Sequence, residues 1–465
     1  MYIKKIIVFL SLAALVFQSC SKLDTPPSDY IDPTKAFRNL DDLNMGVLGA
    51  YAPLSSTLIE NVAIVSDEAM LPTENTVSNT SAHRWLYNST SGSVTSAFYE
   101  YCVAIDRANR VLEAVPNIPA YGAQSRLDQY QAEMLALRAY AYLELLSAYA
   151  SSYEPDGMGL PYVKKPTLEY LARERVKSNF DNMNADLKAA RELMPSGFSD
   201  NSRITKAAIS AIQARVALYE KKWTDAIAYA SEVIASEPLA PKNDFAKVWK
   251  DSSQAEVVWK LARVRGDSRI GGIFFRETGE IVLYAPSFKL IDQFGTPTQR
   301  ADDVRFSSYI QYAPTRPAGK SQYLVNKYVG GDSAYRGLTA VKLFRTGEMY
   351  LIRAEAALEN NDLAAAAKDL NDLRRGRIYN YIDQTFTDKQ SLMNAIYNER
   401  FKELAFEGHR FFDLKRRNLP VERTTQDAIN TSGAVKLMPT AAQYCFPIPA
   451  DEMAVNKKMI QNPNY

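Results

Sequence analysis

The carboxyl-terminal region holds the densest group of residues that could perform chemistry. Glu399, Glu403 and Glu407 are four residues apart, so they would share one face of a continuous helix. The residues among them and just after them are Arg400, His409, Arg410 and Asp413. Two carboxylates about 5–9 Å apart can hydrolyse a glycoside, but here arginine and lysine are interleaved with the acids in equal supply. We therefore interpret the group as a structural ion-pair network that fixes the last segment onto the fold, and we expect no catalytic residue.

The histidine and cysteine content argues against metal-dependent and nucleophilic catalysis. The chain has two histidines, His83 and His409, which leave little material for a His-based metal site or triad. We therefore predict no metal and no cofactor. Its three cysteines cannot form a disulfide framework, and Cys102 and Cys445 lie among apolar neighbours. We expect these two to be buried free thiols.

Composition and charge favour a binding protein. Lys and Arg total 55 and Asp and Glu total 53, and removal of the first 19 residues with Lys4 and Lys5 would leave 53 of each. This balance gives no support for nucleic-acid binding, which usually needs a basic excess. The chain is rich in tyrosine, with 28, and holds only 4 tryptophans. A neutral, tyrosine-rich chain with few residues suited to catalysis indicates a binding protein rather than an enzyme.

The amino terminus predicts export and lipid anchoring. Lys4 and Lys5 precede an apolar run from Ile6 to Phe17 that is too short to span a bilayer, as in a secretory signal. Cys20 follows a small residue and resembles the lipidated cysteine of a bacterial lipobox, although Phe17 stands where leucine is usual. The alternative is ordinary secretion with an incidental cysteine. The polar, proline-rich segment that follows would be an extended tether.

The elements that position these residues are mostly helical. At 465 residues the chain exceeds the roughly 250–300 that one core supports, so we expect two lobes or a repeat array. Apolar stripes predict helices over 98–115, 131–149 and 178–194. An internal repeat then relates positions 214–233 to 354–373 at a constant offset, each copy a helix, a short polar turn and a second helix. This small-residue spacing is typical of tetratricopeptide repeats and predicts a mainly α scaffold.

An irregular insertion separates the two copies of the repeat. From about residue 241 to 340 the helical period fails, and Val257–Leu261 and Glu280–Tyr284 predict short strands. Aromatic residues crowd this segment. A long irregular insertion in a helical scaffold is where a binding surface would normally lie, although any one ring can instead pack a small core.

Several motifs occur in a fixed order along the chain: Cys20, Gly49-Ala50-Tyr51, Arg138-Ala139-Tyr140, the Glu403–Asp413 segment, Phe446-Pro447-Ile448-Pro449 and the Asn462-Pro463-Asn464-Tyr465 end. Together they resemble the SusD/RagB family of surface nutrient-binding lipoproteins, and the resemblance spans the chain. The resemblance implies a right-handed stack of tetratricopeptide-like helix pairs carrying an irregular region. It also implies a non-enzymatic protein on the outer membrane of a Gram-negative bacterium. Such a protein captures oligosaccharides, or in some members peptides, for a SusC-like TonB-dependent transporter.

On this basis the chain divides into five expected segments. They are a signal peptide (1–19), a lipidated tether (20–34), an amino-terminal helical region (35–240), the irregular insertion (241–340) and a carboxyl-terminal region with the last helix pair (341–465).

Ligand contacts are expected from two segments, one near the amino terminus and one in the insertion. A sugar offers an apolar C–H face to an aromatic ring and a hydroxyl rim to Asp, Asn, Glu or Arg. The predicted ligand-binding residues are Asp67, Glu74, Asn75, Trp85, Tyr87, Arg276, Tyr284, Tyr309 and Tyr312. For Trp85, packing in the core is the competing interpretation. For the whole chain, the competing interpretation is a tetratricopeptide scaffold that binds only proteins.

Lipidation at Cys20 can be tested directly. We expect Cys20→Ala to move the protein from the membrane fraction to the soluble fraction, because several acyl chains anchor a protein stably and their attachment point is lost. Fractionation followed by immunoblotting measures the change. A variant that stays as firmly membrane-bound as the parent would place the anchor elsewhere.

Overall fold

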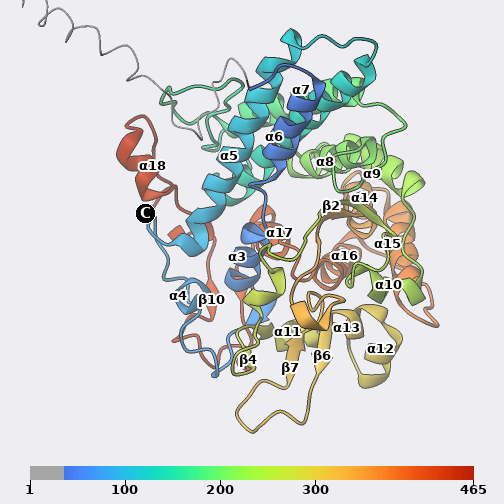
Figure 1. Ribbon diagram of the computed structural model, residues 1–465. Coiled ribbons are helices and arrows are strands. Elements are labelled where there is room, and N and C mark those ends of the chain that lie inside the picture. Colours follow the sequence, from blue (N-terminus) through green and yellow to red (C-terminus); the bar gives the residue numbers. More distant parts are fainter. Residues whose placement is uncertain (1–35) are drawn as a thin grey trace, which may run out of the picture.

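The structure is a computed structural model that describes residues 36–465. The expected signal, tether and lipidated Cys20 lie outside this range. Within it, no helix is long and apolar enough to cross a bilayer. The helices stack in chain order, and the predicted mainly α, tetratricopeptide-like architecture is confirmed (Figure 1).

The amino-terminal helices form the first half of the stack. α2 (Leu40–Tyr51) packs on α5 (Gly92–Ala114), α5 on α6 (Gln124–Tyr149), and α6 on α7 (Val176–Leu193). The shorter α3 (Thr57–Val65) also contacts α5. The three predicted helices are present, and α5 and α6 begin six and seven residues before the expected starts because their first turns carry few apolar residues.

The predicted repeat is confirmed in detail. α8 (Lys206–Tyr219) and α14 (Thr346–Glu359) have bounds 140 residues apart, and α9 (Trp223–Ser236) and α15 (Leu363–Arg377) begin at the same offset. The turn of each pair contains one residue in the left-handed region, Lys221 (φ 60°) or Asn361 (φ 64°), again 140 apart. α9 packs on α14, so the two copies are neighbours in the stack despite the insertion between them.

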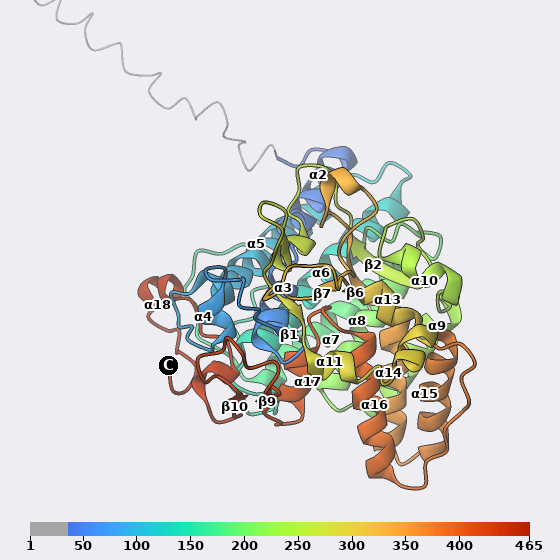
Figure 2. The same ribbon diagram turned by 90° about the horizontal axis from the view of Figure 1, so that it is seen from below.

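The stack ends with α16 (Lys389–Glu403), which packs on α14 and α15 (Figure 2). α17 (Arg410–Arg416) follows and contacts α3, which returns the chain to its amino-terminal part. α18 (Ala450–Val455) lies close to the carboxyl terminus. One expectation is wrong here: Glu407 does not share a helix with Glu399 and Glu403, because α16 ends and Phe406 adopts φ 65°.

The insertion consists of short helices and two-stranded antiparallel sheets. Its helices are α10 (Lys242–Val248), α11 (Phe288–Asp292), α12 (Pro297–Asp302) and α13 (Val304–Tyr309). The paired strands are β2 (Val257–Leu261) with β8 (Val341–Arg345), β3 (Phe275–Arg276) with β4 (Ile281–Val282), and β6 (Ile310–Tyr312) with β7 (Tyr323–Val325). Two more pairs are β1 (Ala69–Met70) with β5 (Ala285–Pro286), which joins segments distant in sequence, and β9 (Val421–Glu422) with β10 (Lys436–Leu437) within the carboxyl-terminal region. The strand expected over 257–261 is confirmed, whereas 280–284 is strand only at β4.

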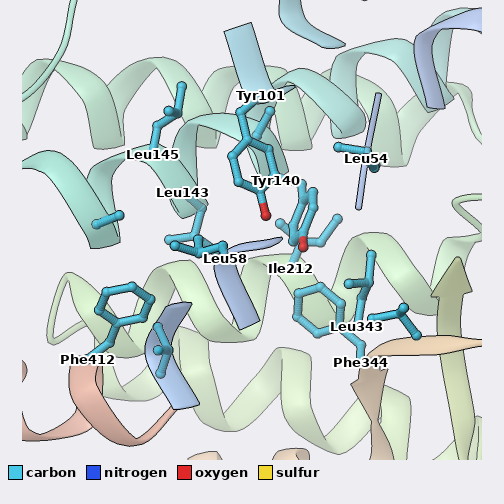
Figure 3. Packing of buried hydrophobic residues seen from close by; sticks show 14 of the residues in the cluster. Leu54, Leu58, Tyr101, Tyr140, Leu143, Leu145, Ile212, Leu343, Phe344 and Phe412 are labelled. Atoms are coloured by element: carbon cyan, nitrogen blue, oxygen red, sulfur yellow. The ribbon is translucent and has the colours of Figure 1, made fainter. Parts of the chain in front are cut away.

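A continuous hydrophobic core of aliphatic and aromatic side chains joins the helical stack to the insertion (Figure 3). The ring of Tyr140 on α6 lies 4.7 Å from that of Trp259 on β2 and 6.0 Å from that of Phe344 on β8, measured between centroids. Tyr101 on α5 approaches the same ring at 6.2 Å. Edge-to-face pairs of this kind stabilise a core beyond their area burial, so the β2–β8 ladder is fixed against α5 and α6.

The carboxyl-terminal charges form a buried ion network, as predicted. Glu403 is fully buried and lies 3.1, 3.0 and 2.9 Å from nitrogens of Arg305, Arg345 and Arg377. Burial opposes ionisation of Glu403, but the three guanidinium groups hold its pKa well below its ordinary value. Glu407 accepts from Arg345 at 2.7 Å and from Lys327 at 2.6 Å. Most partners therefore come from α13, β8, α15 and the insertion rather than from the carboxyl-terminal motif itself.

We expect Arg345→Ala to destabilise the protein by about 3–5 kcal/mol, because it removes the guanidinium that the buried carboxylates of Glu403 and Glu407 share. Chemical denaturation measures the loss. Arg375→Ala is the matched control: Arg375 is half-exposed, its partners Asp372 and Asp383 lie on the surface, and its removal should change stability by less than about 1 kcal/mol. Equal small effects of both substitutions would contradict a stabilising role for the network.

Candidate ligand-binding surface

The structure brings the two predicted ligand-binding segments together. β1 near the amino terminus pairs with β5 of the insertion, with Ala69 opposite Pro286 and Met70 opposite Ala285. The loop after β1 then runs along β4 and the β6–β7 hairpin. These segments are some 200 residues apart in sequence, and together they form one surface at the end of the molecule away from α7 (Figure 1).

Glu74 holds three parts of this surface together. Its carboxylate accepts from the backbone N–H of Val282 at 3.2 Å, from that of Ser321 at 2.9 Å, and from the guanidinium of Arg316 at 2.9 Å. The Glu74 side chain is only 5% exposed. Its oxygens are thus occupied by the protein, and they fix the loop of the β6–β7 hairpin against β4.

Asn75 fixes the loop that contains it. Its side-chain amide donates to the carbonyls of Ser78 (3.1 Å) and Leu283 (2.8 Å), and its oxygen accepts from the N–H of Val77 and Ser78. Tyr284 is fully buried, and its hydroxyl also donates to the Ser78 carbonyl, at 3.1 Å. Asn75 and Tyr284 therefore support this surface by fixing its loop at the Ser78 carbonyl.

Asp67 connects the surface to the carboxyl-terminal motif. Its buried carboxylate accepts from Arg410 on α17 at 2.6 Å and from Lys289 on α11 at 2.6 Å. Burial alone would raise the pKa of Asp67, but Arg410 and Lys289 lower it to about 2. The ion pair is therefore complete at neutral pH and is lost only as the pH falls toward 2.

Like Tyr284, three further predicted aromatic contacts lie in the core. Trp85 is 7% exposed, donates its Nε1–H to the Val65 carbonyl at 2.9 Å, and has the Arg423 guanidinium 4.1 Å from its ring. Tyr87 is also buried and donates its hydroxyl to the Gln443 carbonyl. Tyr309 is fully buried and donates to the Glu403 carbonyl at 2.9 Å. None of these rings offers a free face in this arrangement, and for Trp85 the competing interpretation, packing in the core, describes the observed position.

Two predicted residues are exposed. Tyr312, on β6, is 52% exposed, and Arg276, on β3, also faces solvent. The strand register places Tyr312 opposite Tyr323 of β7, with ring centroids 4.9 Å apart and planes inclined by 35°. Tyr323 was not among the predicted contacts. Its pairing with Tyr312 depends on the hairpin register, for which the sequence between the strands gives no short-turn signal.

The arrangement offers an aromatic platform on a rigid support. The Tyr312–Tyr323 pair projects from a hairpin whose loop is held by Glu74, and Gln311, Gln322 and Arg276 are exposed polar residues of the same hairpins. Aromatic faces bind the C–H face of a sugar, and amide and guanidinium groups donate to its hydroxyls. Glu74, a carboxylate of this surface, is already engaged by the protein.

Comparison with known proteins gives consistent matches. A family model described as "SusD family" matches residues 304–465, and one described as "Starch-binding associating with outer membrane" matches residues 28–218. A SusD-like protein, P25, of Formosa agariphila is 22% identical, with 99% of this chain and 98% of the relative covered.

Solved structures share the fold. A SusD superfamily protein from Bacteroides thetaiotaomicron superposes with a TM-score of 0.81 at 19% identity, covering 92% of this chain and 100% of the other. A structure described as a laminarin binding SusD-like protein gives a TM-score of 0.72 at 19% identity, with the same coverage.

Proposed function

Because the chain belongs to the SusD/RagB family, we propose that it is a cell-surface nutrient-binding lipoprotein that captures oligosaccharides and is not an enzyme. The Tyr312–Tyr323 pair, in which Tyr312 is 52% exposed, is the observation that supports the choice of a sugar ligand. The starch-binding description of the matching family and the laminarin-binding neighbour support a glycan as the ligand class.

Capture follows from the geometry of the platform. A glucan ring can lie with its C–H face on Tyr312 while its hydroxyls meet Gln322, whose side chain lies beside the Tyr312 hydroxyl. Because the hairpin loop is already fixed by Glu74, little conformational entropy is lost when a ligand binds. A peptide is the alternative ligand, since tyrosine faces and arginine also suit extended chains, and a protein-only scaffold is the other alternative.

Two substitutions distinguish a ligand-binding role for Tyr312 from a core-packing role for Trp85. We expect Tyr312→Ala to weaken binding of malto- or laminari-oligosaccharides by about 1–3 kcal/mol, roughly 5- to 150-fold, with an unchanged melting temperature. Trp85→Ala should instead lose about 3–5 kcal/mol of stability. Calorimetry on residues 21–465 and thermal melts measure the two effects.

Tyr170→Ala is the matched control for Tyr312→Ala, because Tyr170 is 54% exposed and lies outside the surface. Full glycan affinity in Tyr312→Ala would show that the Tyr312–Tyr323 pair does not bind the glycan. Binding to peptides alone on a mixed glycan and peptide array would replace the oligosaccharide with a peptide ligand.

Delivery requires a partner in the outer membrane. We propose that lipidated Cys20 anchors the protein there and that a SusC-like TonB-dependent transporter receives the ligand. The support is the amino-terminal pattern and the outer-membrane description of the matching family. We expect the transporter to co-purify after mild detergent extraction; recovery of only free monomer from cells that contain the transporter would contradict the partnership.

A further inference from the structure

A separate cavity of about 870 Å³ opens where the ends of several helices meet. The ends of α8, α14, α16 and α17 and the segment that follows α6 line it, and it shares no lining residue with the Tyr312 surface. Its aromatic lining residues are Tyr153, Tyr219, Trp223, Tyr397 and Tyr444. A cavity of this size can hold a ligand of two or three sugar rings.

Most charged residues of the cavity neutralise one another. The pairs are Lys221 with Glu154 (2.7 Å), Lys389 with Glu359 (2.9 Å) and Arg416 with Glu355 (2.8 Å). Lys415 has no carboxylate partner within residues 36–465, but its ammonium group donates to the carbonyls of Ser147 (3.2 Å) and Ala150 (2.8 Å). The Lys415 donors are therefore directed at the backbone rather than left free for a ligand.

Arg417 differs from these other charged residues of the cavity, since its guanidinium lacks an ion-pair or hydrogen-bond partner among the residues that the structure describes. Over the described part of the chain, no carboxylate lies within 4.0 Å of its guanidinium and its side chain makes no hydrogen bond to the protein. Its guanidinium carbon lies 3.3 Å from the centroid of the Tyr397 ring, and the Tyr397 hydroxyl is held by Glu355 at 2.7 Å. Stacking fixes the plane of the guanidinium and leaves its N–H groups free at the edge. Burial lowers the pKa of Arg417, which an anionic partner would offset.

We propose that this cavity binds a carboxylate-bearing ring of an acidic oligosaccharide, with Arg417 holding the carboxylate. The planar fork of a guanidinium matches a carboxylate through two parallel hydrogen bonds. The aromatic lining suits the C–H faces of sugar rings, and Gln390 and Asn418 can meet their hydroxyls. This second site goes beyond glycan capture at Tyr312 and does not depend on it.

Trigalacturonate and its methyl ester form a matched pair of probes, because they share one ring skeleton and differ in the negative charge. With residues 21–465 in calorimetry at low salt, we expect the acid to bind and the ester to bind at least tenfold more weakly. Arg417→Gln should weaken binding of the acid about 10- to 100-fold, as expected for loss of hydrogen bonds to a charged group. Arg417→Lys, which keeps the charge but loses the fork, should fall in between.

Two controls keep the result specific. Arg375→Gln, at an exposed arginine outside the cavity, should leave trigalacturonate binding unchanged. Tyr312→Ala should also leave it unchanged, so failure at one site is distinguishable from failure at the other. No binding of trigalacturonate at millimolar concentration, equal binding of the ester, or full affinity in a folded Arg417→Gln variant would overturn the proposal. Binding of acidic peptides without any binding of trigalacturonate would also overturn it.

Discussion

The buried carboxylate of Glu403 is the contact on which the position of the binding surface depends. It joins Arg305 in α13, Arg345 at the end of β8 and Arg377 at the end of α15. Taking such ions out of water costs several kcal/mol each, and the cost is recovered only when every partner is in place. The network therefore tolerates one relative position of insertion and helical stack.

Hydrogen bonds to the same ion network hold the β6–β7 hairpin in that position at both of its ends. Tyr309, directly before β6, donates to the Glu403 carbonyl, and Lys327, two residues after β7, donates to Glu407. The loop of the hairpin is fixed separately by Glu74. A hairpin held in this way can display Tyr312 and Tyr323 while Leu324 between its ends packs in a small cluster with Met70, Val282 and Ala285. This is how a helical scaffold supports a small rigid platform.

The sequence predicts local, periodic features well and distant contacts poorly. The 140-residue repeat is read from alanine spacing, and α8, α9, α14 and α15 follow it closely. The ion network is visible as interleaved charges, but its partners Arg305 and Arg345 are not, because contacts across 60 to 100 residues leave no periodic signal.

The binding surface shows the same limit. Tyr309 and Tyr312 are three residues apart, yet one is fully buried and the other is 52% exposed, because the chain changes from helix to strand between them. Asp67, Glu74 and Asn75 are polar residues of a loop, which suggests ligand contact in a sequence, whereas here their side chains bond to the protein.

Hydrogen–deuterium exchange of residues 21–465, with and without the neutral oligosaccharide that binds best, tests the central claim most directly. We predict slower exchange over 310–325 and 72–79 on binding. Protection confined to other segments, with none in the hairpin, would contradict the account.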